Sequence, residues 1–151
     1  MTDAARLLAT PIGRLRTPWK TTSECPRNGR RGDIPECTVE VDEHYIPALK
    51  DLEGYTHLIL LYWLDRAGTP ELQFTPPNDT EPRGLFATRT PRRPNPIGLS
   101  VVKLEGFAAP GILRVRYLDC IDGTPLLDIK PYLPSTDCEP DASMGFQKRS
   151  R

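Results

Sequence analysis

Residues 84–100 carry an unusual combination of rigid backbone and polar side chains. They hold three prolines together with Arg89, Arg92, Arg93 and Asn95. Proline fixes its backbone angle and removes an amide donor, so the remaining amide and guanidinium donors are held in preset directions. That preorganisation suits an anionic or nucleotide ligand. The alternative is a structural turn with solvated arginines, and the composition favours neither.

A second stretch, residues 118–132, combines carboxylates with a turn. Asp122 and Gly123 form a strong turn signal, and an aspartate in such a turn usually caps its own backbone. Asp128 and Lys130 lie two positions apart, so on a strand both side chains face the same side. They are therefore expected to form an ion pair or to line part of a pocket.

The charges balance over the whole chain but not along it. Twenty basic and twenty acidic residues cancel, which excludes a uniformly basic coat for nucleic acid. Two local basic groups remain, and residues 36–53 are acidic. The basic groups are Arg27, Arg30 and Arg31, and Arg83, Arg89, Arg92 and Arg93. If the two groups converge, they form a face suited to phosphates; otherwise they are two solvated loops.

The four cysteines lack the spacing of a metal site. Cys25, Cys37, Cys120 and Cys138 contain no Cys-x-x-Cys pair, and the chain has only two histidines. No metal site is therefore expected. The longest apolar run has seven residues, too few to span a bilayer, and the first six residues do not resemble a secretory signal. A cytoplasmic protein with free thiols and no membrane contact is expected.

The elements that would position these residues are short strands. Seventeen prolines among 151 residues leave few helical windows and favour a loop-rich β protein. Alternating or continuous apolar residues predict strands over 7–16, 37–41, 58–64, 99–107, 112–118 and 124–129. The run 58–64 is expected to be a central, fully buried strand. A short helix is predicted over 47–52, and polar loops over 17–35 and 68–83. These elements predict a small barrel or sandwich.

Two long motifs closely resemble one known family. Residues 86–100 read FATRTPRRPNPIGLS, and residues 122–132 read DGTPLLDIKPY. Residues 11–13 (PIG), 25–28 (CPRN) and 52–57 (LEGYTH) add shorter matches in the same order. Together they resemble the TsaA-like family, also called YaeB, VirR or TrmO, over roughly residues 9–137. The chain is accordingly divided into a barrel domain, 1–137, and a polar C-terminal tail, 138–151.

The resemblance implies a fold, a cofactor and a reaction. The implied fold is a small, mostly antiparallel β-barrel with short helices and long proline-rich loops, paired as a homodimer. The implied activity is S-adenosylmethionine-dependent methylation of N6 in threonylcarbamoyladenosine at position 37 of tRNA. The implied cofactor-binding residues are Pro26, Arg27, Asn28, Asp65, Arg66, Arg89, Leu99, Asp119, Cys120, Ile121 and Asp122.

Other residues suit the tRNA substrate and the proton that N6 must lose. Asp128 and Tyr132 are candidate bases for that proton. The candidate substrate-binding residues are Arg30, Arg31, Arg92, Arg93, Asn95 and Lys130. Tyr62, Trp63 and Tyr132 could stack on a base, although such aromatic residues are more often core. Two alternatives stay open: a methyltransferase acting on another substrate, and a non-catalytic protein that binds S-adenosylmethionine and regulates.

Overall fold

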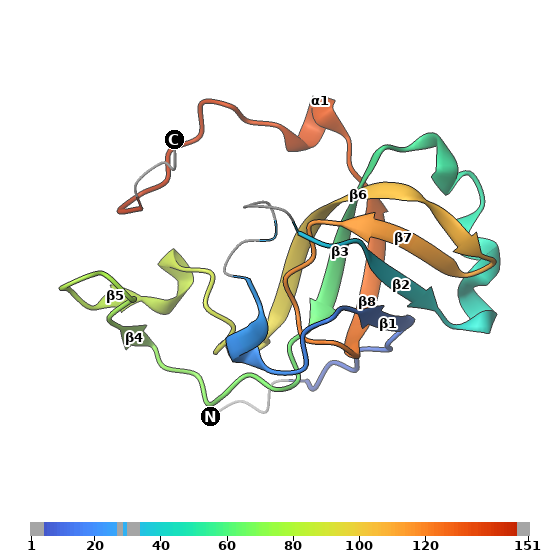
Figure 1. The fold of residues 1–151 in the computed structure, drawn as a ribbon. Helices are drawn as coiled ribbons and strands as arrows, with labels where there is room; N and C mark the ends of the chain where they lie inside the picture. Colours follow the sequence, from blue (N-terminus) through green and yellow to red (C-terminus); the bar gives the residue numbers. More distant parts are fainter. Residues whose placement is uncertain (1–4, 27–28, 30–33, 148–151) are drawn as a thin grey trace. The chain divides into compact units, whose positions relative to one another are not determined.

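The computed structural model describes residues 5–26, 29 and 34–147. Two compact units are present, one formed by residues 1–65 and 97–132 and the other by residues 66–96 and 133–151. The elements are β1 (Gly13–Arg16), η1 (Thr22–Glu24), β2 (Cys37–Val41), η2 (Glu43–Leu49), η3 (Leu52–Gly54), β3 (His57–Trp63), β4 (Gln73–Phe74), β5 (Arg83–Gly84), η4 (Leu85–Ala87), β6 (Ile97–Ala109), β7 (Ile112–Arg116), β8 (Thr124–Pro131) and α1 (Pro134–Asp137). The η elements are 3₁₀-helices. Figure 1 shows where the elements lie along the chain.

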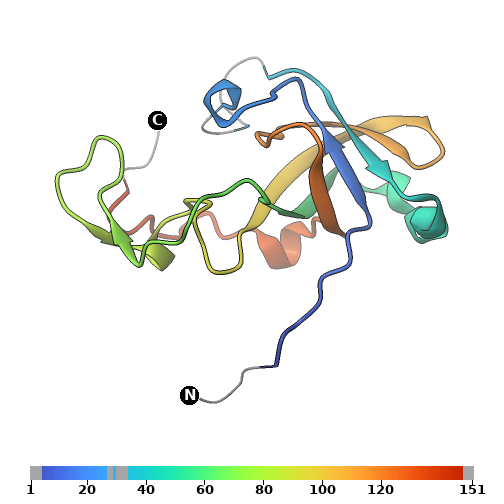
Figure 2. The same cartoon turned by 90° about the horizontal axis from the view of Figure 1, so that it is seen from below.

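The first unit is a closed barrel of six antiparallel strands. The strand order is β1-β2-β7-β6-β3-β8, and β8 pairs with β1 to close the circle. Figure 2 shows β1 in blue between β2 in cyan and β8 in orange. This architecture confirms the predicted mainly β fold and selects the barrel over the sandwich.

Alternating side chains fill the barrel interior. Residues 37–41 form the strand predicted for them, with Cys37, Val39 and Val41 buried. The fully buried side chains come from β1, β2, β3, β6, β7, the loop after β7, and β8. They are Leu15, Val39, Leu58, Leu60, Val102, Leu113, Val115, Leu118 and Leu126.

The expectation of a fully buried central strand is wrong. Residues 58–64 lie mostly in β3, but their burial alternates along the strand. An antiparallel barrel buries only the inward face of each strand, so every second residue of this apolar run faces outward. The outward residues of β3 include Ile59 and Leu61.

The strands also begin and end differently from the prediction. The first strand begins at Gly13, so residues 7–12 lie outside it, although Ile12 still hydrogen-bonds to Leu126 of β8. β6 extends from Ile97 to Ala109, and the turn at 110–111 is as expected, with Gly111 at φ 78°. β7 ends at Arg116 because Tyr117 adopts φ 81° and breaks the alternation.

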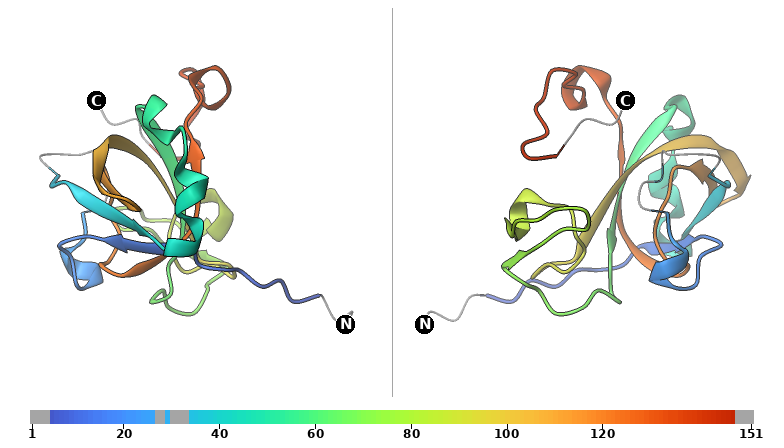
Figure 3. Two further views of the ribbon diagram at one scale, coloured as in Figure 1. Left: turned by 90° about the vertical axis from the view of Figure 1, so that its right-hand side faces the viewer. Right: turned by 60° about the vertical axis from the view of Figure 1, so that its left-hand side comes forward.

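The short helix predicted over 47–52 is present as parts of two 3₁₀-helices, η2 and η3. Proline lies inside η2 rather than in its first turn, and Asp51 at φ 71° separates η2 from η3. Tyr45 and Leu49 of η2 pack against the barrel core, and Ile46 lies against Gly111. Figure 3 shows these teal and green turns beside the barrel. They cover the barrel near its β6–β7 turn.

The second unit contains the small hairpin β4–β5, helix η4 and helix α1. Gln73 pairs with Gly84 and Phe74 with Arg83. The hairpin occupies part of the predicted 68–83 loop, and α1 ends at Asp137, just before the predicted tail of 138–151. The predicted domain boundary at residue 137 stays a prediction.

Candidate functional site

The loop after β7, residues 117–124, contains four of the predicted cofactor residues and has a defined backbone shape. Tyr117 and Gly123 both adopt positive φ angles, 81° and 83°. Thr124 closes the turn: its amide and its Oγ1 both donate to the Ile121 carbonyl, at 3.2 Å and 2.6 Å. A bulky residue in the left-handed region is strained, and such strain concentrates at functional sites.

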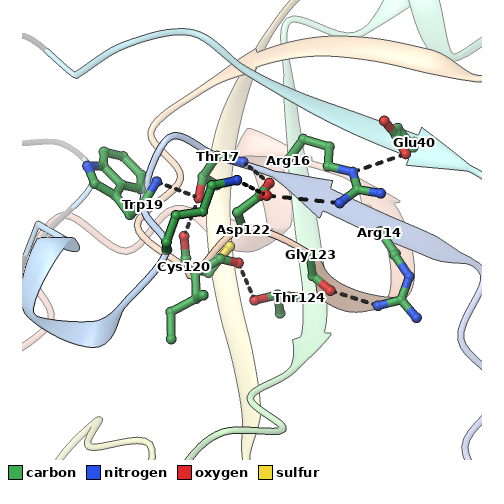
Figure 4. A network of polar contacts seen from close by, with 11 residues as sticks. Arg14, Arg16, Thr17, Trp19, Glu40, Cys120, Asp122, Gly123 and Thr124 are labelled. Atoms are coloured by element: carbon green, nitrogen blue, oxygen red, sulfur yellow. Dashed lines mark hydrogen bonds and ion pairs between the residues drawn. The ribbon is translucent and has the colours of Figure 1, made fainter.

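Asp122 connects this loop to the segment after β1, as Figure 4 shows. Its Oδ1 accepts the Thr17 amide at 3.0 Å, and its Oδ2 lies 2.6 Å from Lys20 Nζ and 4.0 Å from Arg16 Nη1. The hydrogen bond from Lys20 is the largest cause that lowers the pKa of Asp122. Both carboxylate oxygens of Asp122 therefore have partners within the protein.

Further hydrogen bonds join the same two segments (Figure 4). The Thr17 hydroxyl donates to the Cys120 carbonyl at 2.7 Å, and the Asp122 amide donates to the Trp19 carbonyl at 2.7 Å. Arg14 Nη1 donates to the Gly123 carbonyl at 2.8 Å. These bonds anchor residues 17–19 and the Arg14 side chain to the loop after β7.

Asp119 lies in a different environment three residues earlier. Tyr62 Oη donates to its Oδ1 at 3.4 Å, and the Gly29 amide also donates to the carboxylate. Burial is the largest influence on Asp119 and raises its pKa. Burial, followed by the charge of Asp119, raises the pKa of the Cys25 thiol. Gly29 therefore packs against the loop that carries Asp119, and Cys25 lies close enough to feel the Asp119 charge, although both are far from Asp119 in sequence.

Tyr62 and Ser100 support Asp119 from inside the barrel. Tyr62 Oη lies 2.7 Å from Ser100 Oγ, and both residues are buried. Burial raises the pKa of the Tyr62 hydroxyl, which therefore stays protonated and can donate. Gly98 pairs with Tyr62 across β3 and β6, and a Cβ at Gly98 would lie 2.1 Å from the tyrosine ring. Glycine is therefore needed there to accommodate the ring.

Sequence reasoning missed Ser100 and Gly29, and it treated Tyr62 only as core or a stacking ring. Tyr62 is core, but its hydroxyl has a polar role. A buried tyrosine needs a hydrogen-bond partner, and that need was the available signal. The partner itself could not be identified, because Ser100 and Asp119 lie 38 and 57 residues away.

Cys120 and Ile121 contribute mainly backbone to this loop. The Cys120 side chain is buried in the core, and burial raises its thiol pKa to about 12. Its carbonyl accepts the Thr17 hydroxyl, and the Ile121 carbonyl accepts Thr124. The thiol of Cys120 is therefore protonated and unreactive at neutral pH.

Three other predicted residues lie on the outer face of the barrel. Leu99 and Asp128 flank Leu61 in one row across β6, β3 and β8, and Lys130 lies beside Ile59 in the next row. Lys130 Nζ is 2.9 Å from Asp128 Oδ2, so the two residues form an ion pair, as one of the sequence hypotheses expected. Leu99 is 51% exposed whereas its neighbour Ser100 is 8% exposed. The Leu99 side chain therefore faces away from the interior that holds Ser100.

Three further predicted site residues of the barrel unit are described, namely Tyr132, Asp65 and Pro26. Tyr132 follows β8, its amide donates to the His57 carbonyl at 3.1 Å, and its ring centroid lies 6.3 Å from that of His57. Asp65 is exposed just after β3, and its amide donates to the Trp63 carbonyl. Pro26 is half-buried. The predicted residues Arg27, Asn28, Arg30 and Arg31 lie outside the described residues.

In the second unit, the arginines have unlike partners. Arg93 Nη1 donates to the carbonyls of Leu85, Thr88 and Thr90, at 3.5, 2.8 and 3.2 Å. Arg92 pairs with Glu71 at 3.4 Å, both side chains being exposed. Arg83 pairs with Asp79 at 2.9 Å and lies 4.5 Å from the ring centroid of Phe146.

Arg89 differs from these three arginines. It is exposed, and within the described part of the chain no hydrogen bond or ion pair holds its guanidinium. Asn95 and Arg66 are exposed as well. Among the arginines of segment 83–93, Arg89 is thus the one left open to a ligand.

In the described residues, histidine, cysteine and carboxylate side chains do not gather into a metal site. No group of three or more histidine, cysteine, aspartate or glutamate side chains there could hold a metal ion, and the four cysteines are free. Of the helices that the structure describes, none has the length and apolar character needed to cross a bilayer.

Comparisons with known proteins agree on one family. Residues 14–138 match the tRNA-methyltransferase O N-terminal domain. An S-adenosyl-L-methionine-binding protein of Archaeoglobus fulgidus is 42% identical over 132 residues, which cover 87% of this chain and 94% of that protein. A tRNA (adenine(37)-N6)-methyltransferase of Eikenella corrodens is 55% identical over 65 residues, covering 42% of this chain and 37% of that protein.

A solved structure has the same fold. The crystal structure of TrmO from Pseudomonas aeruginosa aligns with a TM-score of 0.78 and 35% identity, covering 95% of this chain. The alignment covers 64% of that TrmO chain, so this chain spans less than two thirds of the solved structure.

Proposed function

The chain belongs to the family of tRNA-methyltransferase O N-terminal domains, and from this we propose that it is an S-adenosylmethionine-dependent methyltransferase. The proposed substrate is threonylcarbamoyladenosine at position 37 of tRNA, and the proposed acceptor atom is N6. The Eikenella relative, named a tRNA (adenine(37)-N6)-methyltransferase, supports this substrate. The Archaeoglobus relative, named for binding S-adenosyl-L-methionine, supports the cofactor.

The meeting of Asp119 with Gly29 and Cys25 is the observation that carries the proposal. These residues belong to two segments that the family resemblance marks as cofactor-binding, and they come together at one place. S-adenosylmethionine presents a ribose diol, an ammonium and a sulfonium. A desolvated carboxylate such as Asp119 gains from donors or positive charge of that kind. The residues present therefore fit the cofactor.

Arg89 is proposed to bind the carboxylate of S-adenosylmethionine, because the family resemblance marks it as a cofactor-binding residue. Its guanidinium can donate two parallel hydrogen bonds to a carboxylate, and no partner in the described residues competes for them. Pro26, Arg27, Asn28, Asp65, Arg66 and the backbone of 120–122 remain proposed contacts. Asp122 is proposed to act indirectly, because its oxygens hold Thr17 and Lys20.

The reaction requires the protein mainly to position the acceptor nitrogen against the methyl group. S-adenosylmethionine supplies a methyl group whose bond to sulfur breaks, with its electron pair passing to sulfur, as the bond to N6 forms. The protein must align N6 with that bond and accept one proton from the nitrogen. Asp128 and Tyr132 stay the candidate bases. Lys130, Arg92, Arg93 and Asn95 stay candidate contacts to the substrate.

Mass spectrometry of tRNA nucleosides tests the proposal. tRNA that carries threonylcarbamoyladenosine is incubated with the protein, with and without S-adenosylmethionine, and then digested. We expect the modified nucleoside to gain one methyl group only when both protein and cofactor are present. Methylation of another nucleoside would favour a different substrate.

Cofactor binding without any methylated product would instead favour a regulator. The name of the Archaeoglobus relative states that it binds S-adenosyl-L-methionine and states no reaction, and this supports the regulator as the alternative. Light scattering on the same preparation tests the proposed homodimer, for which a mass twice that of the chain is expected. A monomer that is fully active would remove the homodimer and leave the methyltransferase standing.

A further inference from the structure

Phe86 is an exposed aromatic residue on a well-anchored turn of the second unit. It lies in η4 and is 77% exposed, while its neighbour Leu85 is 2% exposed. Leaving a phenyl ring in water costs hydrophobic free energy that burial would recover. A single exposed apolar residue needs no explanation by itself, so the surroundings of the ring decide its meaning.

The turn below the ring is held in one shape. The Thr88 amide and hydroxyl both donate to the Leu85 carbonyl, at 3.1 Å and 2.8 Å. Arg93 Nη1 donates to the carbonyls of Leu85, Thr88 and Thr90, and so bridges both ends of the turn. The ring is therefore presented by a preorganised support.

Arg93 also covers one side of the ring. Its Cζ lies over the phenyl ring, 5.6 Å from the centroid. The partners of Arg93 are neutral carbonyl groups, so its positive charge is not cancelled. Phe86 is thus backed by a cation on one face while most of its surface stays exposed.

The segment that carries the ring has an excess of positive charge. Between Glu81 and Pro96 the sequence has four arginines and no acidic residue. Arg83 pairs with Asp79 and Glu81, and Arg92 pairs with Glu71, but Arg89 and Arg93 have no acidic partner in the described residues. Arg92 is bound to Glu71 only through an exposed pair, and the hydrogen-bond partners of Arg93 are neutral carbonyl groups. A protein partner would have to desolvate these guanidinium groups, whereas RNA phosphates would pair with them.

We propose that Phe86 is a stacking platform for an unpaired base of an RNA, with phosphates of the same strand contacting Arg92. Single-stranded loops expose base faces, and such bases stack on aromatic side chains while arginines hold the backbone. Only the class of ligand, an RNA with an unpaired loop such as the anticodon loop, rests on the function proposed above.

The test compares RNA with and without unpaired bases. The full chain is titrated with an anticodon stem-loop RNA and with a blunt RNA duplex that has the same number of phosphates. Phe86→Ala should weaken stem-loop binding about ten-fold, the effect of losing one base–aromatic stack, and leave duplex binding unchanged. Leu72→Ala, which removes another side chain of this unit with 76% exposure, should change neither.

Phe86→Trp keeps an aromatic face and reports stacking directly. It should bind the stem-loop as the natural chain does, and its added tryptophan emission should be quenched by the stem-loop but not by the duplex. Equal losses on both RNAs, or no loss with Phe86→Ala, would overturn the stacking role. So would a change from dimer to monomer on sedimentation of Phe86→Ala, because the ring would then contact a second copy.

Failure of this inference is distinguishable from failure of the proposed function. Stem-loop binding that depends on Phe86, without methyl transfer to tRNA, would contradict the methyltransferase alone. Methyl transfer that is indifferent to Phe86→Ala, at tRNA concentrations below saturation, would contradict the stacking role alone. An absence of stem-loop binding by the natural chain overturns the inference.

Discussion

The loop 117–124 of the barrel unit and the segment 83–93 of the second unit each combine charged residues bound within the fold with one that is more open. In the barrel loop, Asp122 binds Thr17 and Lys20, whereas Asp119 accepts a long hydrogen bond from Tyr62 and hydrogen bonds from backbone amides. In the arginine segment, Arg93 binds three carbonyls, whereas Arg89 is open. Residues of one type, three or four positions apart, therefore have different partners within the fold.

The difference separates structural from ligand-binding candidates. A side chain whose hydrogen-bonding atoms are already paired loses those bonds if a ligand takes them. Asp122 and Arg93 are accordingly expected to affect stability, and Asp119 and Arg89 to affect ligand binding. Each of the following changes tests one side of this comparison.

The largest expected effect on stability comes from Asp122→Ala. The change removes a charged acceptor of the Thr17 amide and of Lys20, and should lower the free energy of unfolding by about 2–3 kcal/mol. Urea denaturation at neutral pH measures it. Asp128→Ala is the control, because its exposed ion pair with Lys130 should contribute less than about 1 kcal/mol. Equal losses would contradict the structural role of Asp122.

Arg89→Ala should weaken S-adenosylmethionine binding by about 1.5–3 kcal/mol, or roughly ten-fold to a hundred-fold. Its stability should not change, because no partner in the described residues is lost. Calorimetric titration measures the affinity. Arg92→Ala is the matched control and should bind the cofactor normally. Unchanged affinity in a folded Arg89→Ala protein would remove Arg89 from the cofactor site.

Arg93→Lys should loosen the turn that carries Phe86. Lysine keeps the charge but lacks the planar guanidinium that bridges three carbonyls, so local opening should become easier by about 1 kcal/mol. Hydrogen exchange of residues 85–93 measures this opening. Arg89→Lys should leave exchange unchanged. Identical exchange in both variants would show that Arg93 is as free as Arg89.

The smallest effects concern pH and should have opposite signs at the two aspartates. The pKa of Asp122 is lowered from 3.8, so its ionised form stabilises the fold above that pH, and the contribution is lost as pH falls through the lowered pKa. The pKa of Asp119 is raised from 3.8 by burial, so its ionisation destabilises the fold as pH rises above that value.

Unfolding measured against pH separates the two aspartates. Relative to the natural chain, Asp122→Asn should lose stability as pH rises through the lowered pKa of Asp122 to above 3.8, and Asp119→Asn should gain stability as pH rises above 3.8. Parallel curves for the two variants would contradict the comparison. The stability difference for Asp122→Asn should shrink again at the acid end.

Local patterns in the sequence were enough to predict much of the barrel and its turns. Residues 37–41 alternate and form β2 with the predicted bounds. The turns at Gly111 and Gly123 lie where the sequence predicts turns. The Asp128–Lys130 ion pair follows from the two-residue period of a strand. Periodicity and turn residues act over a few positions, so the sequence displays them directly.

Tertiary structure decided the closure of the barrel and the partner of each charged group. The spacing of residues predicts which strand face is apolar, but it does not reveal that β8 returns to β1 or that Tyr62 reaches Asp119. The same limit explains why 58–64 was expected to be fully buried. Asp119 and Asp122 look alike in sequence, and Arg89 and Arg93 do too. Their surroundings differ because the groups that bury or bind each side chain come from other parts of the chain, in several cases from segments far away in sequence. Only the folded chain brings those groups together.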